Sequence, residues 1–302
     1  MRILYIAKHG QKNNDDEGAI TYALSALGHE VVLCHEKTAS DEARHHKADL
    51  ALVHHFRDFS LIRSLRMSKV FWCFDLIDWP TDSGLWERSR ARKNWLRAMI
   101  TTTDLGFMTD GDAVARDRSG KLTQLCQGAD ERILDKPLPI YELQWEVLFA
   151  GISGGGGAIR ESFVQEMRET YGNNFHHVQN KYREELAELV RKSAICVAPD
   201  SPVSDSYWSN RIYIMLGFGA FLLHPWSKGL AEQYTQREEI VYYHSRDELR
   251  MLVEYYLERP DERARISTNA VKRTLAEHTY RHRVSKLIEA IQSRLGEKIG
   301  SC

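Results

Sequence analysis

The sequence lacks the features that define several large protein classes. Its five cysteines show no CxxC spacing, so we expect reduced thiols rather than zinc ligands or a disulfide framework. No apolar run approaches the length of a membrane span, and the first ten residues resemble a strand rather than a signal peptide. We therefore expect a cytoplasmic location and no membrane span. The pattern GxGxxG is missing after the first apolar run, which argues against an enzyme that binds a dinucleotide.

The chain also lacks an excess of either charge. Lys plus Arg is 41 and Asp plus Glu is 42, which gives a net charge of −1. No global basic field therefore indicates nucleic acid, although a local basic patch remains open. Hydrophobic residues make up 43% and charged residues 27%, and 302 residues suffice for two domains of ordinary size.

Short apolar runs alternate with segments of helical spacing along the whole chain. This alternation is typical of α/β domains built on parallel sheets. The predicted strands of the first half are residues 2–7, 31–34, 48–53, 70–74, 105–109 and 122–127, and those of the second half are 147–150, 175–178, 194–198, 221–223 and 241–243. A segment with two prolines, 135–141, is the expected linker.

The most informative stretch is 200–225. A strand before it is followed by a polar loop, a helix predicted over 207–218, a glycine turn and another strand. The loop should lie at the carboxyl edge of a parallel sheet, where such folds bind ligands. The start of the helix and Arg211 could there bind a phosphate group. An ordinary strand–helix–strand unit with a surface arginine is the alternative.

Three motifs carry a resemblance to a known family. They are Tyr207-Trp208-Ser209-Asn210-Arg211, the run from Gly217 to Leu223, and Glu277 to Val284. Residues 146–291 resemble the carboxyl-terminal domain of CgeB-like, group 1 glycosyltransferases. The resemblance implies the α/β GT-B fold: a Rossmann-like acceptor-side domain over 1–138, a nucleotide-sugar domain over 139–279, and a helix in 280–302 that returns to the first domain.

The resemblance also implies a donor site. A glycine loop that begins at Gly151 and includes Gly154 would close over the diphosphate, with Arg160 shortly after it. Arg211 resembles the arginine near the donor phosphates. The other implied donor-site residues are Gly18, which could instead merely ease a turn, and Asp205, Tyr207, Ser209 and Asn210.

One departure from the family concerns the ribose. Group 1 enzymes often hold its hydroxyls with a glutamate, and Ile214 occupies that position here. An aliphatic side chain accepts no hydrogen bond, so Asp205 would have to replace it or donor binding is unusual. A degenerate GT-B protein that binds a nucleotide-sugar without turnover is therefore kept as an alternative.

Candidate catalytic residues are acidic. Asp75 and Asp78 follow a buried strand of the first half, and Asp16 lies at the first helix start; any of them could act as a base. Asp78 could instead cap a turn before a proline. His54 and His55 are further cleft candidates, although a histidine pair is more often structural.

The acceptor is predicted only in outline. The helix 86–97 carries Arg88, Arg92, Lys93 and Arg97 beside two tryptophans, which fits contact with DNA or an anionic surface; a solvated helix face is the alternative. The motifs are similar to glycosyltransferases of phages and bacteria, some of which modify hydroxylated DNA bases. A cell-surface glycan, a protein or a small molecule is the other acceptor class.

Together these features predict a glycosyltransferase of the EC 2.4 type that moves a sugar from a nucleotide-sugar to a hydroxyl group. A UDP-sugar is the expected donor, and no metal ion is expected to be obligatory. The family context implies retention at the anomeric carbon, while an inverting route through Asp75 or Asp78 stays open.

Overall fold

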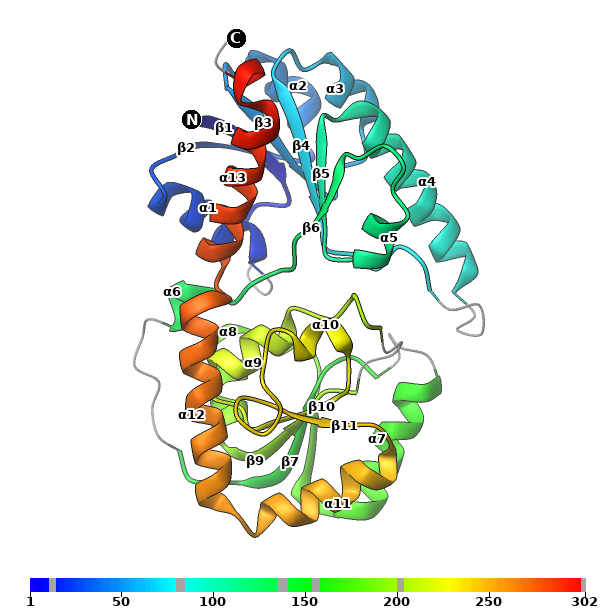
Figure 1. Cartoon of the computed structure of the whole chain (residues 1–302), viewed down its shortest axis with the longest axis vertical. Helices are drawn as coiled ribbons and strands as arrows, with labels where there is room; N and C mark the ends of the chain where they lie inside the picture. Colours follow the sequence, from blue (N-terminus) through cyan, green and yellow to red (C-terminus); the bar gives the residue numbers. More distant parts are fainter. Residues whose placement is uncertain (11–14, 80–84, 135–140, 154–157, 200–203, 300–302) are drawn as a thin grey trace. The chain divides into compact units, whose positions relative to one another are not determined.

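The computed structural model describes residues 1–10, 15–79, 85–134, 141–153, 158–199 and 204–299. The chain divides into two compact units (Figure 1). The first unit consists of Met1–Gln127 together with Tyr280–Cys302, and the second of Gly128–Thr279. Residues 128–134 therefore belong with the second unit, whereas the sequence had placed them in the first domain. Among the described residues, no helix has both the length and the apolar character needed to cross a membrane.

The first unit is built on a six-stranded parallel sheet with the order β2-β1-β3-β4-β5-β6. The strand order reverses between β1 and β3, which is where open α/β sheets bind ligands. The strands are β1 (Arg2–Ala7), β2 (Glu30–His35), β3 (Leu50–His54), β4 (Ser68–Cys73), β5 (Leu105–Met108) and β6 (Leu122–Gln124).

Helices cover both faces of this sheet because alternate residues of the central strands are apolar on both sides. On one face α1 (Asp16–Ala26) and α13 (Tyr280–Ile299) pack against residues such as Tyr5 and Trp72. The helices of the opposite face are α2 (Ala39–Glu42), α3 (Phe59–Ser64), α4 (Trp86–Thr102) and α5 (Gly111–Ala115). A short 3-10 helix, η1, covers Ala43–His45.

The second unit contains a five-stranded parallel sheet with the order β11-β10-β9-β7-β8. Its strands are β7 (Trp145–Ala150), β8 (Phe175–Val178), β9 (Ser193–Val197), β10 (Leu222–Pro225) and β11 (Val241–Tyr243). Here the order reverses between β7 and β9. The carboxyl ends of these two strands thus define the expected binding edge.

The helices of the second unit also cover both faces. α7 (Ala158–Tyr171), α11 (Arg246–Leu257) and the start of α12 (Pro260–Glu277) bury apolar side chains against one face. The remaining elements are α6 (Glu131–Leu134), η4 (Gly172–Asn174), α8 (Arg183–Arg191), α9 (Arg211–Gly217) and α10 (Lys228–Ala231). The α/β prediction is confirmed by both sheets.

Two predicted elements are clearly shorter than the sequence indicated. The strand expected over 122–127 is β6, which covers only Leu122–Gln124. The helix expected over 207–218 begins only at Arg211 and ends at Gly217. The indole N–H of Trp208 donates to the Tyr213 hydroxyl at 2.8 Å, and this hydroxyl donates to Gln233 Oε1 at 2.7 Å. Trp208 is therefore buried by a cross-link to the helix rather than by helical spacing.

Candidate functional site

The turn after β7 forms one wall of the predicted donor site. A Cβ atom on Gly151 would lie 2.8 Å from the Phe149 ring, so the close packing requires glycine. The Gly151 carbonyl lies 2.9 Å from Nε2 of His177, whose ring stacks on Phe149 with 5.1 Å between centroids. The predicted residue Gly154 and the rest of the four-glycine run lie outside the described residues.

Arg211 lies at the first position of α9, after the N-cap residue Asn210. Among the described residues, no carboxylate lies within ion-pair distance of its guanidinium. Burial is the main cause that lowers the pKa of Arg211; the Tyr182 side chain raises it and the charge of Arg160 lowers it further. A half-buried cation beside a second cation is an unfavourable arrangement that a bound anion would stabilise.

Arg160 belongs to the first turn of α7. Its Nη1 donates to the carbonyl of Ile152 at 3.1 Å, which turns the guanidinium toward the loop that follows β7. Its charge acts on Arg211, so the two predicted phosphate-binding arginines are electrostatic neighbours. The structure therefore brings Gly151, Arg160 and Arg211 together at the carboxyl edge of the second sheet.

The loop before α9 is held mainly by backbone contacts. Oδ1 of Asp205 accepts from the Lys228 N–H at 3.0 Å, and its carbonyl accepts from the Gly229 N–H at 2.9 Å. A Cβ atom on Gly229 would lie 2.6 Å from that carbonyl. Asp205 is thus exposed and anchors the loop to α10, and its role toward ribose stays a prediction.

The other predicted donor residues surround Arg211. Ser209 Oγ accepts from the Arg211 backbone N–H at 3.3 Å, while Tyr207 and Asn210 are half-buried. Ile214 lies one turn after Arg211, with its N–H donating to the Asn210 carbonyl. The position of the family glutamate is therefore aliphatic in the structure as well, next to the predicted phosphate site.

The candidate acids of the first unit are ion-paired. Asp75 accepts from Arg92 at 2.7 Å and lies 3.7 Å from Nδ1 of His55. Asp78 lies 2.7 Å from Lys93 Nζ and 3.4 Å from Arg116. The sequence predicted separate catalytic and DNA-binding groups, but the structure pairs Arg92 and Lys93 with those acids.

The two other cations predicted to contact DNA, Arg88 and Arg97, remain exposed. The Arg88 guanidinium lies 5.7 Å from the centroid of the Trp79 ring. Arg97 donates to Asn94 Oδ1 at 3.3 Å, which is a neutral partner. Within the described part of α4, the charge available to an acceptor therefore comes mainly from Arg88, Arg90 and Arg97.

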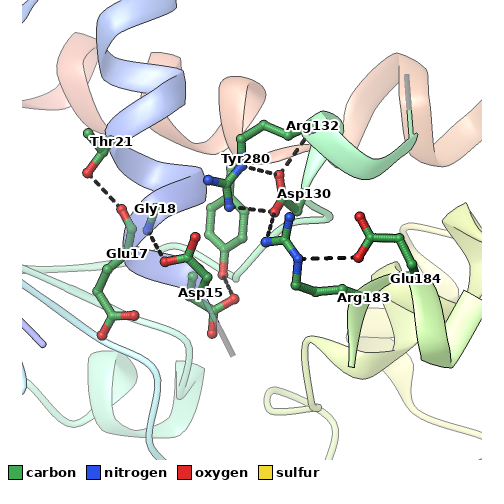
Figure 2. Close-up of polar contacts among 10 residues, drawn as sticks. Asp15, Glu17, Gly18, Thr21, Asp130, Arg132, Arg183, Glu184 and Tyr280 are labelled. Atoms are coloured by element: carbon green, nitrogen blue, oxygen red, sulfur yellow. Dashed lines mark hydrogen bonds and ion pairs between the residues drawn. The ribbon is translucent and has the colours of Figure 1, made fainter. Parts of the chain in front are cut away.

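Asp16 joins the two helices on one face of the first sheet. The Tyr280 hydroxyl, at the start of α13, donates to Asp16 Oδ1 at 2.7 Å, and both residues are buried. Figure 2 shows the neighbouring helix cap, in which Asp15 Oδ1 accepts from the Gly18 N–H at 3.0 Å. A Cβ atom on Gly18 would collide with the Asp15 side chain, so local packing is enough to explain why this position is glycine. The catalytic role of Asp16 and the phosphate role of Gly18 stay predictions.

In the second unit, Figure 2 shows a separate ionic network. Asp130 lies 2.6 Å from Arg132 and 3.6 Å from Arg183, and Arg183 lies 3.5 Å from Glu184. Arg183 has a φ of +51°, which is uncommon outside glycine. These pairs connect α6 with the start of α8 within the second unit.

Three side chains of the first unit have metal-ligand chemistry. His55, Cys73 and Asp75 bring one ligand atom each within 4.8 Å of one another. Burial strongly raises the pKa of the Cys73 thiol, which disfavours the thiolate that a metal needs. Arg92 already pairs with Asp75. The cluster therefore does not fit a divalent cation.

Glu17 gives a prediction about pH. The pKa of Glu17 is raised to about 7, chiefly by burial, and the charges of Asp16 and Asp15 raise it further. A hydrogen bond from its own backbone N–H and the charge of Lys8 lower it. Between its ordinary pKa of 4.5 and about 7, the unfolded chain loses the proton first, so stability falls as pH rises. In urea titrations, Glu17→Gln should raise the free energy of unfolding by about 2 kcal/mol at pH 8 and little at pH 4. The exposed Glu87→Gln is the control, and an equal effect of both would refute the prediction.

Comparison with known proteins identifies similarity to glycosyltransferases in the second half of the chain. Residues 159–289 match the family model described as "Glycosyl transferase-like". This segment contains Arg160 and the whole of α9. A search of curated protein sequences finds no match.

Several solved structures share the fold over nearly the whole chain. Sucrose-phosphate synthase from Thermosynechococcus elongatus is 12% identical with a TM-score of 0.69, covering 98% of this chain and 100% of that chain. Anabaena Alr3699/HepE in complex with UDP and glucose is 12% identical with a TM-score of 0.64, covering 97% and 100%. An alpha-glucosyltransferase in complex with UDP and a 13-mer DNA is 11% identical with a TM-score of 0.62, covering 97% and 100%. The chain therefore has the GT-B fold, as its sequence predicted.

Proposed function

We propose that the protein is a glycosyltransferase that moves a sugar from a nucleotide-sugar donor to a hydroxyl group. The observation that carries the proposal is the pair Arg160 and Arg211 at the carboxyl edge of the second sheet. Arg211 is half-buried and has no carboxylate within ion-pair distance among the described residues. A diphosphate supplies two negative charges, which complement two neighbouring guanidinium groups.

The same pair provides a chemical mechanism. When the bond between the sugar and the diphosphate breaks, negative charge grows on the leaving phosphate. Arg211 and Arg160 stabilise the transition state, in which this charge has grown, more strongly than they stabilise the bound donor in its ground state. This difference lowers the barrier without an obligatory metal ion. We expect a UDP-sugar as the donor, because UDP and glucose occupy the similar Anabaena structure.

The stereochemical course is part of the proposal. We propose retention at the anomeric carbon; in the alternative inverting route, Asp75 or Asp78 would take the acceptor proton. The anomeric configuration of the first product formed, read by NMR, decides between the two.

The test is a ligand screen followed by a transfer assay. Thermal unfolding is measured with UDP, GDP, ADP, CMP and their sugars, with magnesium and with EDTA. A ligand at one hundred times its dissociation constant stabilises the folded state by about 2.7 kcal/mol. We expect a UDP-dependent shift that EDTA leaves unchanged. Binding without hydrolysis or transfer would favour the degenerate binder, and no shift with any nucleotide would refute the donor site.

DNA is the second candidate acceptor, because α4 is basic and one similar structure contains DNA. Arg92 and Lys93 are paired with acids, so the test uses Arg88→Glu with Arg97→Glu. If α4 contacts phosphates, this double variant should weaken binding to hydroxymethylated DNA and reduce the salt slope by about two. An unchanged slope in a fluorescence-anisotropy titration would exclude this surface. Arg63→Glu, on α3, is the matched control.

A further inference from the structure

A cleft opens at the carboxyl edge of the sheet in the first unit. Its volume is about 930 Å³, which is in the range of small-molecule sites. Its walls come from the loops after β1, β2, β3 and β4 and from α4. The cleft therefore lies beside the reversal of strand order between β1 and β3, where this class of sheet binds ligands.

The walls of the cleft carry more cations than acids. The basic side chains are Lys8, Lys37, Arg57, Arg88 and Arg92. Arg92 pairs with Asp75, but the four others have no carboxylate within ion-pair distance among the described residues. They come from four separate segments, so the folded chain gathers them at one place.

Most of the carboxylates that line the cleft already form hydrogen bonds or ion pairs. Asp58 accepts from the Leu61 N–H at 2.9 Å and from Ser60 Oγ at 3.0 Å, as the N-cap of α3. Asp75 accepts from Arg92. Of the three acids in the described wall, Glu36 is left to balance four unpaired cations. This excess of positive charge indicates an anionic ligand.

His55 lies among these charges. Burial lowers the pKa of His55 and Asp75 raises it, while Lys8, Arg92 and Arg57 lower it, so all four charged groups act on its ring. Its φ of +52° is strained for a residue with a side chain, and its ring packs edge-on against His54 at 4.2 Å. The backbone conformation and the ring packing hold the imidazole in place inside the basic cleft.

We infer that this cleft binds a phosphate group on a small hydroxyl acceptor, with Lys8 and Arg57 as its main cationic contacts. The inference rests on the proposed function, since it names the acceptor class. A phosphate monoester carries up to two charges and three acceptor oxygens, which matches several convergent cations better than a single carboxylate does. A bounded cleft favours a small phosphorylated compound over the backbone of DNA, which needs a continuous row of contacts.

The experiment measures anion binding without any donor. In the Arg211→Ala background, which disables the proposed donor site, inorganic phosphate and pyrophosphate are titrated by calorimetry at low ionic strength. We expect millimolar binding that Lys8→Gln with Arg57→Gln weakens at least tenfold. Arg63→Gln, which removes an exposed arginine on α3 outside the cleft, should leave it unchanged. No binding, or equal binding in all three proteins, would overturn the inference.

Two further readouts separate the remaining outcomes. A duplex oligonucleotide that binds through Lys8 and Arg57 more tightly than pyrophosphate would assign the cleft to DNA and overturn the small acceptor. Thermal unfolding of the double variant should match that of its parent closely, because neither side chain has an ion pair or a hydrogen bond with a described residue. Phosphate binding without a thermal shift from any nucleotide or nucleotide-sugar would retain the anion site and refute the proposed donor site.

Discussion

Replacing Arg211 by alanine should weaken UDP binding about 100-fold and lower kcat/KM by a similar factor or more. The guanidinium offers paired N–H donors to two phosphate oxygens. With alanine in its place, the negative charge of the phosphates has no partner at this position of the sheet edge. Arg211→Lys keeps the charge but loses the forked geometry, so it should retain part of the affinity. Calorimetry with UDP and a donor-hydrolysis assay measure the two effects.

The same substitution separates function from stability. Arg211 has no described carboxylate partner and its charge is disfavoured by burial. Without ligand, Arg211→Ala should therefore unfold at the same or a higher temperature, although it loses the UDP-dependent shift. Lys272→Ala, an exposed change in the same unit, should alter neither property. Full activity in Arg211→Ala would show that the donor phosphates bind elsewhere.

Replacing Asp110 by alanine should destabilise the first unit by about 3 kcal/mol, because two buried N–H groups lose their acceptor. Asp110 is fully buried. Its Oδ2 accepts from the Ile77 N–H at 2.8 Å, and its Oδ1 accepts from the Ala113 N–H at 3.0 Å as the N-cap of α5. Urea titration measures the loss, and hydrogen exchange at Ile77 locates it.

The consequence should extend to the cleft. The segment that Asp110 holds carries Asp75 and Asp78, so a looser segment should weaken phosphate binding while UDP binding stays unchanged. Asp110→Asn retains one acceptor oxygen and should lose about half as much stability. Asp112→Ala, on the same helix but exposed, is the control. If it costs as much as Asp110→Ala, helix propensity rather than the lost hydrogen bonds explains the effect.

The strands were predictable because both faces of each sheet are covered. Strands such as β1 and β3 are nearly continuous apolar runs, and their existence follows from that composition. The boundaries of β1 match the prediction, whereas β3 begins two residues later and ends one residue later than predicted. The return of α13 to the first sheet came from the resemblance. The apolar spacing of α13 predicted a buried helix face but did not identify the sheet against which it packs.

The two arginines of the donor site were predicted on different grounds: Arg211 from its place at a helix start, and Arg160 only from the family resemblance. Their role toward the donor stays a prediction. The pairs Arg92–Asp75 and Lys93–Asp78 were missed because a charge partner is set by tertiary structure, so acids and bases were assigned to different roles. Asp110 was missed for the same reason: its importance depends on the Ile77 N–H, from a different loop.

The order of the chain has a consequence for folding during synthesis. The second unit is an uninterrupted segment, Gly128–Thr279, whereas the first needs α13 to cover one face of its sheet. During translation, the second unit can therefore complete its core while the first, although made earlier, still exposes apolar side chains. Residues such as Tyr5 and Trp72 wait for Leu287 and Ile291 to leave the ribosome. The first unit should accordingly be the part of the chain that depends on chaperones. A nascent chain stalled before Tyr280 should bind a chaperone more strongly than the complete chain does.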